Sequence, residues 1–375
     1  MPENTLIGFR GSPTPTLGVE WEFALTDRVT GDLSNTAAAL FTEVEQRYPQ
    51  LAGKVHKELL RNTVELVTGV CNTTGEAIAD LASILDPVRA VAGELGVDLY
   101  GAGTHPFAEW STQLLTEGHR YAELIERTQY WGRQMLIWGV HVHVGISHRD
   151  KVLPILSSLL NYYPHLLACS ASSPMWSGQD TNYASNRAMM FQQLPTAGLP
   201  FQFTEWSEFE AFVADQKTTG IIDHINEIRW DIRPSPHLGT IEVRVCDGMT
   251  NLVELSAIVA LIHCLVVDLD RRLTAGEELP HMAPWLVQEN KWRAARYGLD
   301  AIVILDSECN ERLVTDDLRD VLIRLQPIAA ELGCLDELAG IEAIIEQGAS
   351  YQRQRSVFAQ TNDMRAVVAS VVGEL

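Results

Sequence analysis

Residues 17–25 read Leu17-Gly-Val-Glu-Trp-Glu-Phe-Ala-Leu25, and their central part alternates between apolar and acidic side chains. Successive side chains of a β-strand point to opposite faces, so the apolar residues share one face while Glu20 and Glu22 share the other. A solvated edge strand can show the same pattern. Two carboxylates on one face repel each other unless solvent or cations lie nearby. The segment therefore predicts a strand with one buried face and one acidic face.

A second segment, Gly139-Val-His-Val-His-Val-Gly145, has the same alternation. Its valines share one face, and His141 and His143 share the other, between two glycines. A lone buried histidine is usually structural, but two histidines at this spacing indicate a crowded polar site that a ligand or metal approaches.

A third segment, Thr240-Ile-Glu-Val-Arg-Val-Cys246, places Glu242 and Arg244 on one face. On its own this pair could be a surface ion pair, which contributes about 0–1 kcal/mol. The repetition of one pattern in three segments favours a shared functional face over three unrelated surface strands.

A fourth segment, Lys57-Glu-Leu-Leu-Arg-Asn-Thr-Val-Glu-Leu-Val67, adds Glu58 and Glu65. Their odd spacing would place them on opposite faces of one flat strand. We therefore expect a bulge or loop near Arg61 and Asn62 if both carboxylates face one site.

If these four segments lie side by side, one face of a sheet gathers many carboxylates around an imidazole. Such a set is costly without cations. Oxygen ligands with one or two imidazoles suit Mg²⁺ or Mn²⁺ better than Zn²⁺. The predicted metal ligands are Glu20, Glu22, Glu58, Glu65, His141 and Glu242.

Helical periodicity alternates with isolated strands along the chain, without a regular βαβ rhythm, which favours an α+β fold. No repeat or linker marks a boundary, so we expect a single domain over residues 1–375. Pro87 is expected to kink or split the second helix. The predicted helices are Thr36–Tyr48, Glu76–Leu95, Gly118–Met135, Val152–Ala168, Leu252–Leu273, Thr315–Leu332, Leu335–Gln347 and Thr361–Val372, and the further strands are Thr63–Thr68 and Asp98–Gly101.

The chain of 375 residues is acidic, with 28 Lys and Arg against 49 Asp and Glu and a formal net charge of −21. Such a surface repels phosphate backbones and anionic lipid, so we expect no nucleic-acid or membrane partner. The longest apolar run, Ala257–Val267, is shorter than the roughly 20 residues of a bilayer span. The N-terminal residues lack the features of a signal peptide. We expect a cytoplasmic protein with small-molecule substrates, which could form a homo-oligomer.

Arginines concentrate in a few segments of this acidic chain. Arginine forks match phosphate and carboxylate groups, so arginines combined with carboxylates and metal indicate a nucleoside triphosphate site. Each arginine taken alone is more often a surface or helix-end residue. No GxxxxGK[ST] or strand-linked GxGxxG motif is present, which argues against P-loop and Rossmann binding. The candidates are Arg187, Arg229, Arg233, Arg353 and Arg355, with Asn290 as a further polar contact.

Taken together, these motifs resemble the YbdK-type carboxylate–amine ligases, the family also called glutamate–cysteine ligase type 2. The resemblance runs from about residue 17 to 355. It implies a glutamine-synthetase-like fold, in which a curved, mainly antiparallel sheet carries helices on its outer face. The matching segments are LGVEWEF, VELVTGVC, GTHPF, GVHVHVG, SASSPMW, DTNYASNR, IRWDIRP, GTIEVRVCD, ENKWRAARYGLDA and GASYQRQR.

The resemblance also implies roles for individual residues. Glu20 and Glu22 would each give a ligand to one of two Mg²⁺ ions, and Glu58, Glu65, His141 and Glu242 would complete the metal site. His143 would contact the nucleotide phosphates, and the concentration of arginines adds Arg353 and Arg355 as further nucleotide-binding candidates. Arg244 would face the transferring phosphoryl group, with Arg233 beside it as a second catalytic arginine. Arg187, Arg229 and Asn290 would contact the substrates.

The expected activity is an ATP-dependent ligase that joins L-glutamate to L-cysteine through an acyl phosphate and releases ADP and phosphate. One alternative joins glutamate or another carboxylate to a different amine. A second is a non-catalytic relative that binds a nucleotide or an amino acid. A third, a guanidino kinase, fits the acidic and histidine strands poorly.

Overall fold

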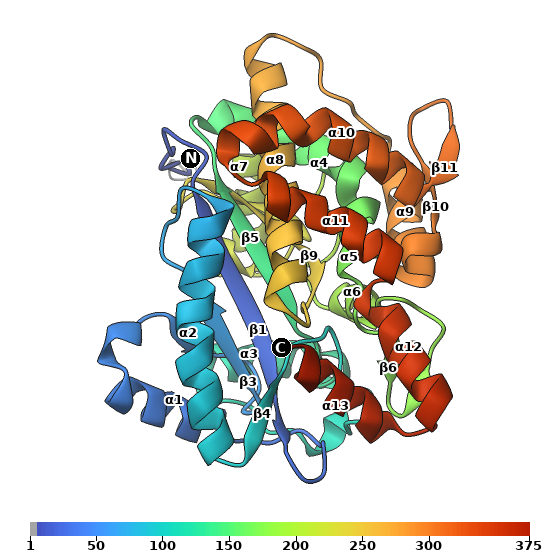
Figure 1. Ribbon diagram of the computed structural model, residues 1–375. Coiled ribbons are helices and arrows are strands. Elements are labelled where there is room, and N and C mark those ends of the chain that lie inside the picture. Colours follow the sequence, from blue (N-terminus) through green and yellow to red (C-terminus); the bar gives the residue numbers. More distant parts are fainter. Residues whose placement is uncertain (1–5) are drawn as a thin grey trace.

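Within residues 6–375, the part of the chain that the computed structural model describes, seven strands form one antiparallel sheet (Figure 1). Its strand order is β2-β3-β1-β5-β9-β8, and β4 pairs with the far end of β1. The seven strands are β1 (Leu17–Asp27), β2 (Val55–Lys57), β3 (Thr63–Val67), β4 (Val97–Tyr100), β5 (Gly139–Gly145), β8 (Ile232–Ser235) and β9 (Thr240–Asp247). The predicted strands are therefore confirmed.

Helices cover the apolar face of this sheet. In Figure 1, α2 lies across β1 and β3, α8 lies across β5, and α11 packs on the outer side of α8. The helices are α1 (Ala37–Arg47), α2 (Thr74–Glu94), α3 (His119–Arg133), α4 (Val152–Leu159), α5 (Tyr163–Ser170), α6 (Asn186–Phe191), α7 (Trp206–Thr218), α8 (Leu252–Thr274), α9 (Pro284–Tyr297), α10 (Val314–Leu332), α11 (Leu335–Gln347), α12 (Ser350–Thr361) and α13 (Met364–Glu374). Two small hairpins pair β6 (Met175–Trp176) with β7 (Gln179–Asp180), and β10 (Ile302–Ile304) with β11 (Glu311–Leu313).

The core lies between the sheet and these helices. Val19, Trp21 and Phe23 of β1 have no exposed surface, and the alternating valines of β5 join them in one hydrophobic cluster. Burial of an apolar side chain stabilises the fold by about 1.5–3 kcal/mol, so this face fixes which way each strand is turned. The ionisable residues must then occupy the opposite face.

Several helices differ from their predicted extents. Pro87 does not split α2, which continues through it because Ile84, Leu85 and Val88 are buried around the proline. The predicted helix Val152–Ala168 is divided into α4 and α5 by a 3-10 turn at Leu160–Tyr162. The helices α6, α7, α9 and α12 were not predicted. In α9 and α12 polar residues outweigh the apolar stripe that marks an amphipathic helix.

Two helical stretches, Arg149–Ser170 and Leu252–Thr274, are long and apolar enough to cross a membrane by length and composition alone. In each, 78% of the most apolar window is buried inside the protein, as expected of core helices. The prediction that the N-terminal residues lack a signal peptide rests partly on residues 1–5. These lie outside the described residues.

Candidate functional site

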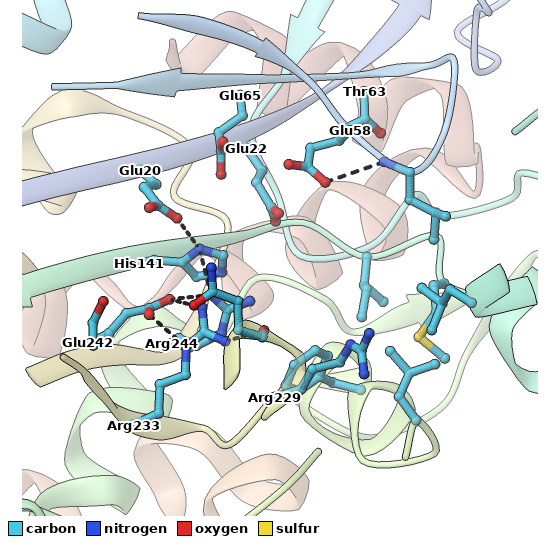
Figure 2. A pocket seen from close by; sticks show the side chains of 18 of the residues that line it. Glu20, Glu22, Glu58, Thr63, Glu65, His141, Arg229, Arg233, Glu242 and Arg244 are labelled. Carbon is cyan, nitrogen blue, oxygen red and sulfur yellow. Dashed lines mark hydrogen bonds and ion pairs between the residues drawn. The ribbon is translucent and has the colours of Figure 1, made fainter. Parts of the chain in front are cut away.

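A cavity of about 370 Å³ opens on the polar face of the sheet. Figure 2 shows Glu20, Glu22 and Glu65 approaching His141 from one side, while Glu242, Arg233 and Arg244 lie on the other. Of the predicted site residues, those that line the cavity are Glu20, Glu22, Glu58, Glu65, His141, His143, Arg229, Arg233, Glu242 and Arg244. The structure thus brings together all six predicted metal ligands.

The strand register explains why these side chains meet. Because paired residues on neighbouring strands lie about 4.5–5.5 Å apart, each strand pair adds one contact to a continuous row. A register shift between Val140 and Val142 interrupts the regular pairing of β5 with β9 next to His141. The cross-strand pairs, in the order of the strands, are Glu65 with Glu22, Glu20 with His141, His143 with Glu242, and Glu242 with Arg233.

Glu20 lies between the two histidines. Its Oε2 atom is 2.8 Å from His141 Nδ1, and its Oε1 atom is 3.2 Å from His143 Nε2. Burial opposes ionisation of Glu20, but the hydrogen bonds to both imidazoles bring its pKa well below the usual range. Burial, followed by the charge of Arg244, lowers the pKa of His141 to about 4. Glu20 is therefore an anion beside a neutral imidazole, the protonation states that metal ligands require.

Glu242 is held by two arginines. Arg233 donates to it from Nε at 2.6 Å and from Nη2 at 3.2 Å, and Arg244 donates to it from Nη1. Burial opposes its ionisation, but the charges of Arg244 and Arg233 lower the pKa of Glu242. The Nη1 atom of Arg244 also lies 3.3 Å from His141 Nδ1. This part of the cavity carries positive charge beside the imidazoles, which suits an anionic ligand.

The carboxylates of Glu22, Glu65 and Glu58 form the acidic part of the cavity. Burial, followed by the charge of Glu58, raises the pKa of Glu22 to about 7. Burial and the charges of Glu58, Glu20 and Glu22 raise the pKa of Glu65 well above its usual range. Among the described residues, neither Glu22 nor Glu65 forms an ion pair with Lys or Arg. Buried anions of this kind need a proton or a cation for neutralisation.

Two overlapping groups of side chains could hold a cation. Glu20, His141 and Glu242 each offer a ligand atom, and these atoms lie within 4.8 Å of one another. Glu22, Glu65 and His141 meet the same condition. The donor set is rich in carboxylate oxygen and contains one imidazole, so it fits hard divalent cations such as Mg²⁺ or Mn²⁺.

The segment that carries Glu58 and Glu65 is not one continuous strand, as their odd spacing predicted. Glu58 directly follows β2, Glu65 lies in β3, and residues 58–62 form the connection between these strands. Both side chains consequently reach one cavity.

Arg187 does not line the cavity but lies directly behind it. Its side chain is buried, and its Nη1 atom donates to the carbonyl of Arg244 at 3.2 Å. A Cβ atom at Gly139 would lie 2.1 Å from Arg187 Nη2, so the glycine leaves room for the guanidinium. The Gly139 N–H donates to Glu22 Oε2 at 2.6 Å. These contacts let Arg187 support Glu22 and Arg244 from outside the cavity, and its contact with substrate stays a prediction.

Arg353, Arg355 and Asn290 also lie away from the cavity. Arg353 forms ion pairs with Glu254 at 2.7 Å and Glu374 at 2.8 Å. Arg355 forms a two-pronged ion pair with Asp180 at 2.8 and 2.9 Å. Asn290 exchanges two hydrogen bonds with the backbone of Ile304. None of the three lines the cavity, so the structure does not bring them together with the other predicted site residues, and their nucleotide and substrate contacts stay predictions.

Sequence reasoning missed the remaining walls of the cavity. Thr63, Ser235 and His237 come from the strands or turns already considered and could have been found from their proximity to Glu65 and Glu242. Tyr121 comes from α3 and Asn226 from the 3-10 turn Ile225–Glu227, and no motif marks either of them. The other missed residues are apolar and indistinguishable from core residues in the sequence: Leu59, Leu60, Leu124, Met135, Ile137, Phe191, Leu194 and Leu238.

The chain is similar to known proteins over nearly its whole length. The model of a family described as "Glutamate-cysteine ligase family 2 (GCS2)" matches residues 16–370. A protein of Mycobacterium ulcerans named "Putative glutamate--cysteine ligase 2" is 69% identical over 98% of this chain and 93% of its own length. A protein of Mycobacterium sp. (strain JLS), named "Putative glutamate--cysteine ligase 2-1", is 67% identical over 100% of this chain and 99% of its own length.

Two solved structures share the architecture. Glutamate–cysteine ligase from Francisella tularensis, solved in complex with AMP, aligns with a TM-score of 0.71 and 11% identity over 97% of this chain and 89% of that chain. A bifunctional glutathione synthetase from Pasteurella multocida aligns with a TM-score of 0.66 and 14% identity over 96% of this chain and 51% of that chain. At these identities the likeness shows the fold alone, and it confirms the predicted glutamine-synthetase-like arrangement.

Proposed function

The chain belongs to glutamate–cysteine ligase family 2, and on that basis we propose that it is an ATP-dependent ligase that joins the side-chain carboxylate of L-glutamate to an amine. Within the family the expected product is γ-glutamylcysteine. The observation that carries the proposal is the row of carboxylates, imidazoles and arginines that crosses four strands in one cavity.

The first step transfers the γ-phosphoryl group of ATP. A carboxylate oxygen of the substrate attacks the γ-phosphorus while the bond to the bridging oxygen of ADP breaks. Arg244 and Arg233 would stabilise the negative charge that develops on the transferring group, and their hydrogen bonds to Glu242 hold both guanidinium groups in place. His143 is held by Thr240 Oγ1 at 2.9 Å and by Glu20 Oε1 at 3.2 Å, so its proposed contact with a phosphate oxygen would replace the bond to Glu20.

Divalent cations fit the donor groups that the cavity provides. Glu20, His141 and Glu242 would hold one cation, and Glu22 and Glu65 would hold a second. A bound Mg²⁺ ion supplies charge neutralisation between the triphosphate and the substrate carboxylate. The pairing of Glu20 with His141 at 2.8 Å orients both ligands before any cation arrives.

The second step forms the amide. The amine nitrogen attacks the carbonyl carbon of the acyl phosphate, and the bond from that carbon to the phosphate oxygen breaks. One proton of the ammonium group leaves with inorganic phosphate, and a second passes to solvent. The acyl phosphate makes this possible because a free carboxylate would have to expel an oxide ion.

We further propose that the protein acts in the cytoplasm on small-molecule substrates.

Release of ADP in the presence of Mg²⁺, glutamate and a panel of amines tests the proposal. We expect amine-dependent ADP release by the purified protein. Glu22→Gln should reduce turnover by at least about 100-fold, since it removes a charge from the cation site while keeping the size of the side chain. Glu45→Gln, at an exposed position of α1, should leave turnover unchanged.

Circular dichroism should show that Glu22→Gln is folded. Absence of amine-dependent ADP release from every carboxylate–amine pair would reject the proposed function. A Glu22→Gln variant that turns over at nearly the wild-type rate would reject the role of Glu22 alone.

A further inference from the structure

Arg187 is a buried cation that the proposed chemistry does not use. The residue is 4% exposed, and among the described residues it forms no ion pair. Its Nε atom has no hydrogen-bond partner in the same part of the chain. A buried charge without a counter-charge destabilises the folded protein, and a neutral side chain would fill the space without that effect. The guanidinium group of Arg187 therefore requires an explanation other than packing.

The guanidinium group lies beside an irregularity of β9. The pairing of β5 with β9 shifts by one residue between Val140 and Val142. Arg244 and Val245 of β9 therefore both lie opposite the single residue His141. Two residues opposite one is the arrangement of a β-bulge, which interrupts the ladder and changes the direction of the side chains that it carries. This bulge of Arg244 and Val245 consequently influences how Arg244 enters the cavity.

Both backbone polar groups of Arg244 bond to partners outside β5. Its N–H donates to the carbonyl of Asp231 at 2.8 Å, just before β8. Its carbonyl accepts from Arg187 Nη1 at 3.2 Å, and the same Nη1 atom lies 3.5 Å from the carbonyl of Val245. The extra residue of a bulge has no partner in the ladder, and a guanidinium group presents several donors in a fixed plane. Arg187 thus supplies a donor where the regular ladder is interrupted.

The end of β9 also holds the backbone of Arg187. Because of the register shift, Asp247 pairs with Gly139, and cross-strand partners share a face of the sheet. The Asp247 carboxylate accepts from Ser173 Oγ at 2.6 Å and from Ser185 Oγ at 2.8 Å. Ser173 Oγ in turn accepts the N–H of Arg187 at 3.1 Å. Asp247 therefore fixes where the side chain of Arg187 starts, and the bulge receives its end.

The side chain of Arg244 extends from the bulge to the cation site. Its Nη1 atom donates to Glu242 and lies 3.3 Å from His141 Nδ1, and Figure 2 shows the three side chains together. Its Nε atom has no hydrogen-bond partner among the described residues. The direction of Arg244 therefore depends on the conformation of the bulge as well as on Glu242.

We propose that Arg187 is a positioning residue, which holds the bulge in the conformation that aims Arg244 at the transferring phosphoryl group. The inference rests on the proposed ligase function and goes beyond it by giving Arg187 a role without any contact with substrate. The family resemblance implies a substrate contact instead. The two roles differ in the quantity that they change, because a substrate contact contributes to KM, whereas a positioning residue contributes to kcat.

Steady-state ADP release by Arg187→Met tests the proposal, with ATP, glutamate and the best amine of the panel each varied in turn. Methionine fills much of the same space but has no donor. We expect kcat to fall about 10- to 100-fold, because a misplacement of about 1 Å in a catalytic group can lower the rate about 100-fold. The KM values for ATP and glutamate should stay within about twofold of those of the wild type.

Two further variants accompany Arg187→Met. Arg187→Lys keeps the charge but not the planar fork, so its kcat should lie between those of the wild type and Arg187→Met. It also serves if Arg187→Met does not fold. Arg296→Met is the matched control, because Arg296 donates to the carbonyl of Asn182 in the same loop before α6. This control should leave kcat unchanged.

A double variant shows whether Arg187 acts through Arg244. Arg244→Met alone should lower kcat by at least about 100-fold. Addition of Arg187→Met should then lower kcat by less than about threefold, because the side chain that Arg187 aims is already absent. The crystal structure of Arg187→Met gives a readout that does not depend on activity. It should show a changed bulge in β9 and the loss of the hydrogen bond from Arg244 to Glu242.

The outcomes separate this inference from the function on which it rests. A raised KM for glutamate or ATP with an unchanged kcat would overturn the positioning role and favour a substrate contact. Wild-type kcat in Arg187→Lys, losses that multiply in the double variant, or an unchanged bulge with Arg244 still bonded to Glu242 would also overturn it. No ADP release by the wild type with any carboxylate–amine pair would reject the ligase function, and the crystal structure of the variant would still show whether Arg187 holds the bulge.

Discussion

The Glu65 side chain shows how a single residue of the site destabilises the folded protein. Its side chain is 9% exposed, it pairs across the strands with Glu22, and Glu58 and Glu20 lie near enough to oppose its charge. A buried carboxylate among other carboxylates destabilises the folded state, and only a ligand or a proton offsets this. Its presence is therefore better explained by binding than by folding.

Replacement of Glu65 by glutamine should stabilise the protein in the absence of divalent cations. We expect Glu65→Gln to raise the free energy of unfolding in EDTA at pH 8 by about 1 kcal/mol or more, because one like charge is removed from a buried cluster. The same variant should lose the stabilisation that Mg²⁺ gives the wild type. Urea denaturation with and without Mg²⁺ measures both effects. A less stable variant in EDTA would show that Glu65 has a structural role.

At this scale, sequence reasoning found the cavity through the side chains of the strands, with Glu58 and Arg229 beside them, whereas Arg353 and Arg355 lie outside it. Alternation within a strand fixes the face of Glu20, His141 and Glu242, whatever the rest of the chain does. No such rule applies to Arg353 and Arg355, which lie on a helix and whose partners, Glu374 and Asp180 among them, come from other segments. An acidic protein offers an arginine many carboxylates as ion-pair partners, and the sequence pattern does not show which of them it will contact.

Individual elements were predictable to the extent that their burial is regular. The apolar side chains of the longer strands and of the long helices recur with clear periodicity. The strand β8 is short and contains Pro234, which is tolerated because β8 is an edge strand. The helices α9 and α12 carry too little apolar periodicity to be recognised. The pairing order of the strands could not be read from the chain, because β5 and β9 are adjacent in the sheet but about a hundred residues apart in sequence.

His105 fastens the loop after β4 to the turn after β1. Its Nε2 atom lies 2.9 Å from the carbonyl of Gly31, and its Nδ1 atom accepts the N–H of Ala108 at 3.0 Å. A protonated imidazole has no acceptor atom, so it could not keep the bond to Ala108. Burial, opposed by the hydrogen bond to Gly31 and the charge of Asp32, lowers the pKa of His105 to about 4.

This contact predicts a loss of stability in mild acid. The unfolded chain binds a proton at His105 near pH 6.5, and the folded chain binds it only near pH 4, so stability is fully present above pH 6.5 and falls as the pH decreases toward 4. The expected contribution is up to about 3 kcal/mol. His105→Gln should flatten this part of the curve in urea titrations, and His148→Gln, at an exposed position, should not. Identical slopes for wild type and His105→Gln would contradict the prediction.

For the molecule as a whole, the end of the chain closes back onto its middle. In Figure 1 the C-terminus lies beside the sheet, and α13 contacts β4. Arg353 of α12 links Glu374 of α13 to Glu254 of α8, and Thr250 Oγ1 donates to Glu374. This network ties the last two helices to the helix that covers the sheet, and none of its residues lines the cavity.

Removal of Arg353 should therefore affect stability and leave nucleotide binding unchanged. Arg353→Met leaves the half-buried Glu254 and Glu374 without their shared partner, and we expect the free energy of unfolding to fall by about 1–3 kcal/mol. KM for ATP should not change. Arg365→Met, at a position 67% exposed, serves as the control and should have little effect. A large rise in KM for ATP without a loss of stability would restore the predicted nucleotide contact of Arg353.

The central claim is that β1, β3, β5 and β9 together hold paired divalent cations where a phosphoryl group is transferred. Anomalous diffraction from crystals soaked with Mn²⁺ and ADP tests it most directly. The account predicts two anomalous peaks in the cavity, one bounded by Glu20, His141 and Glu242 and one in contact with Glu22 and Glu65. Crystals that bind ADP but show no peak among these side chains would contradict it.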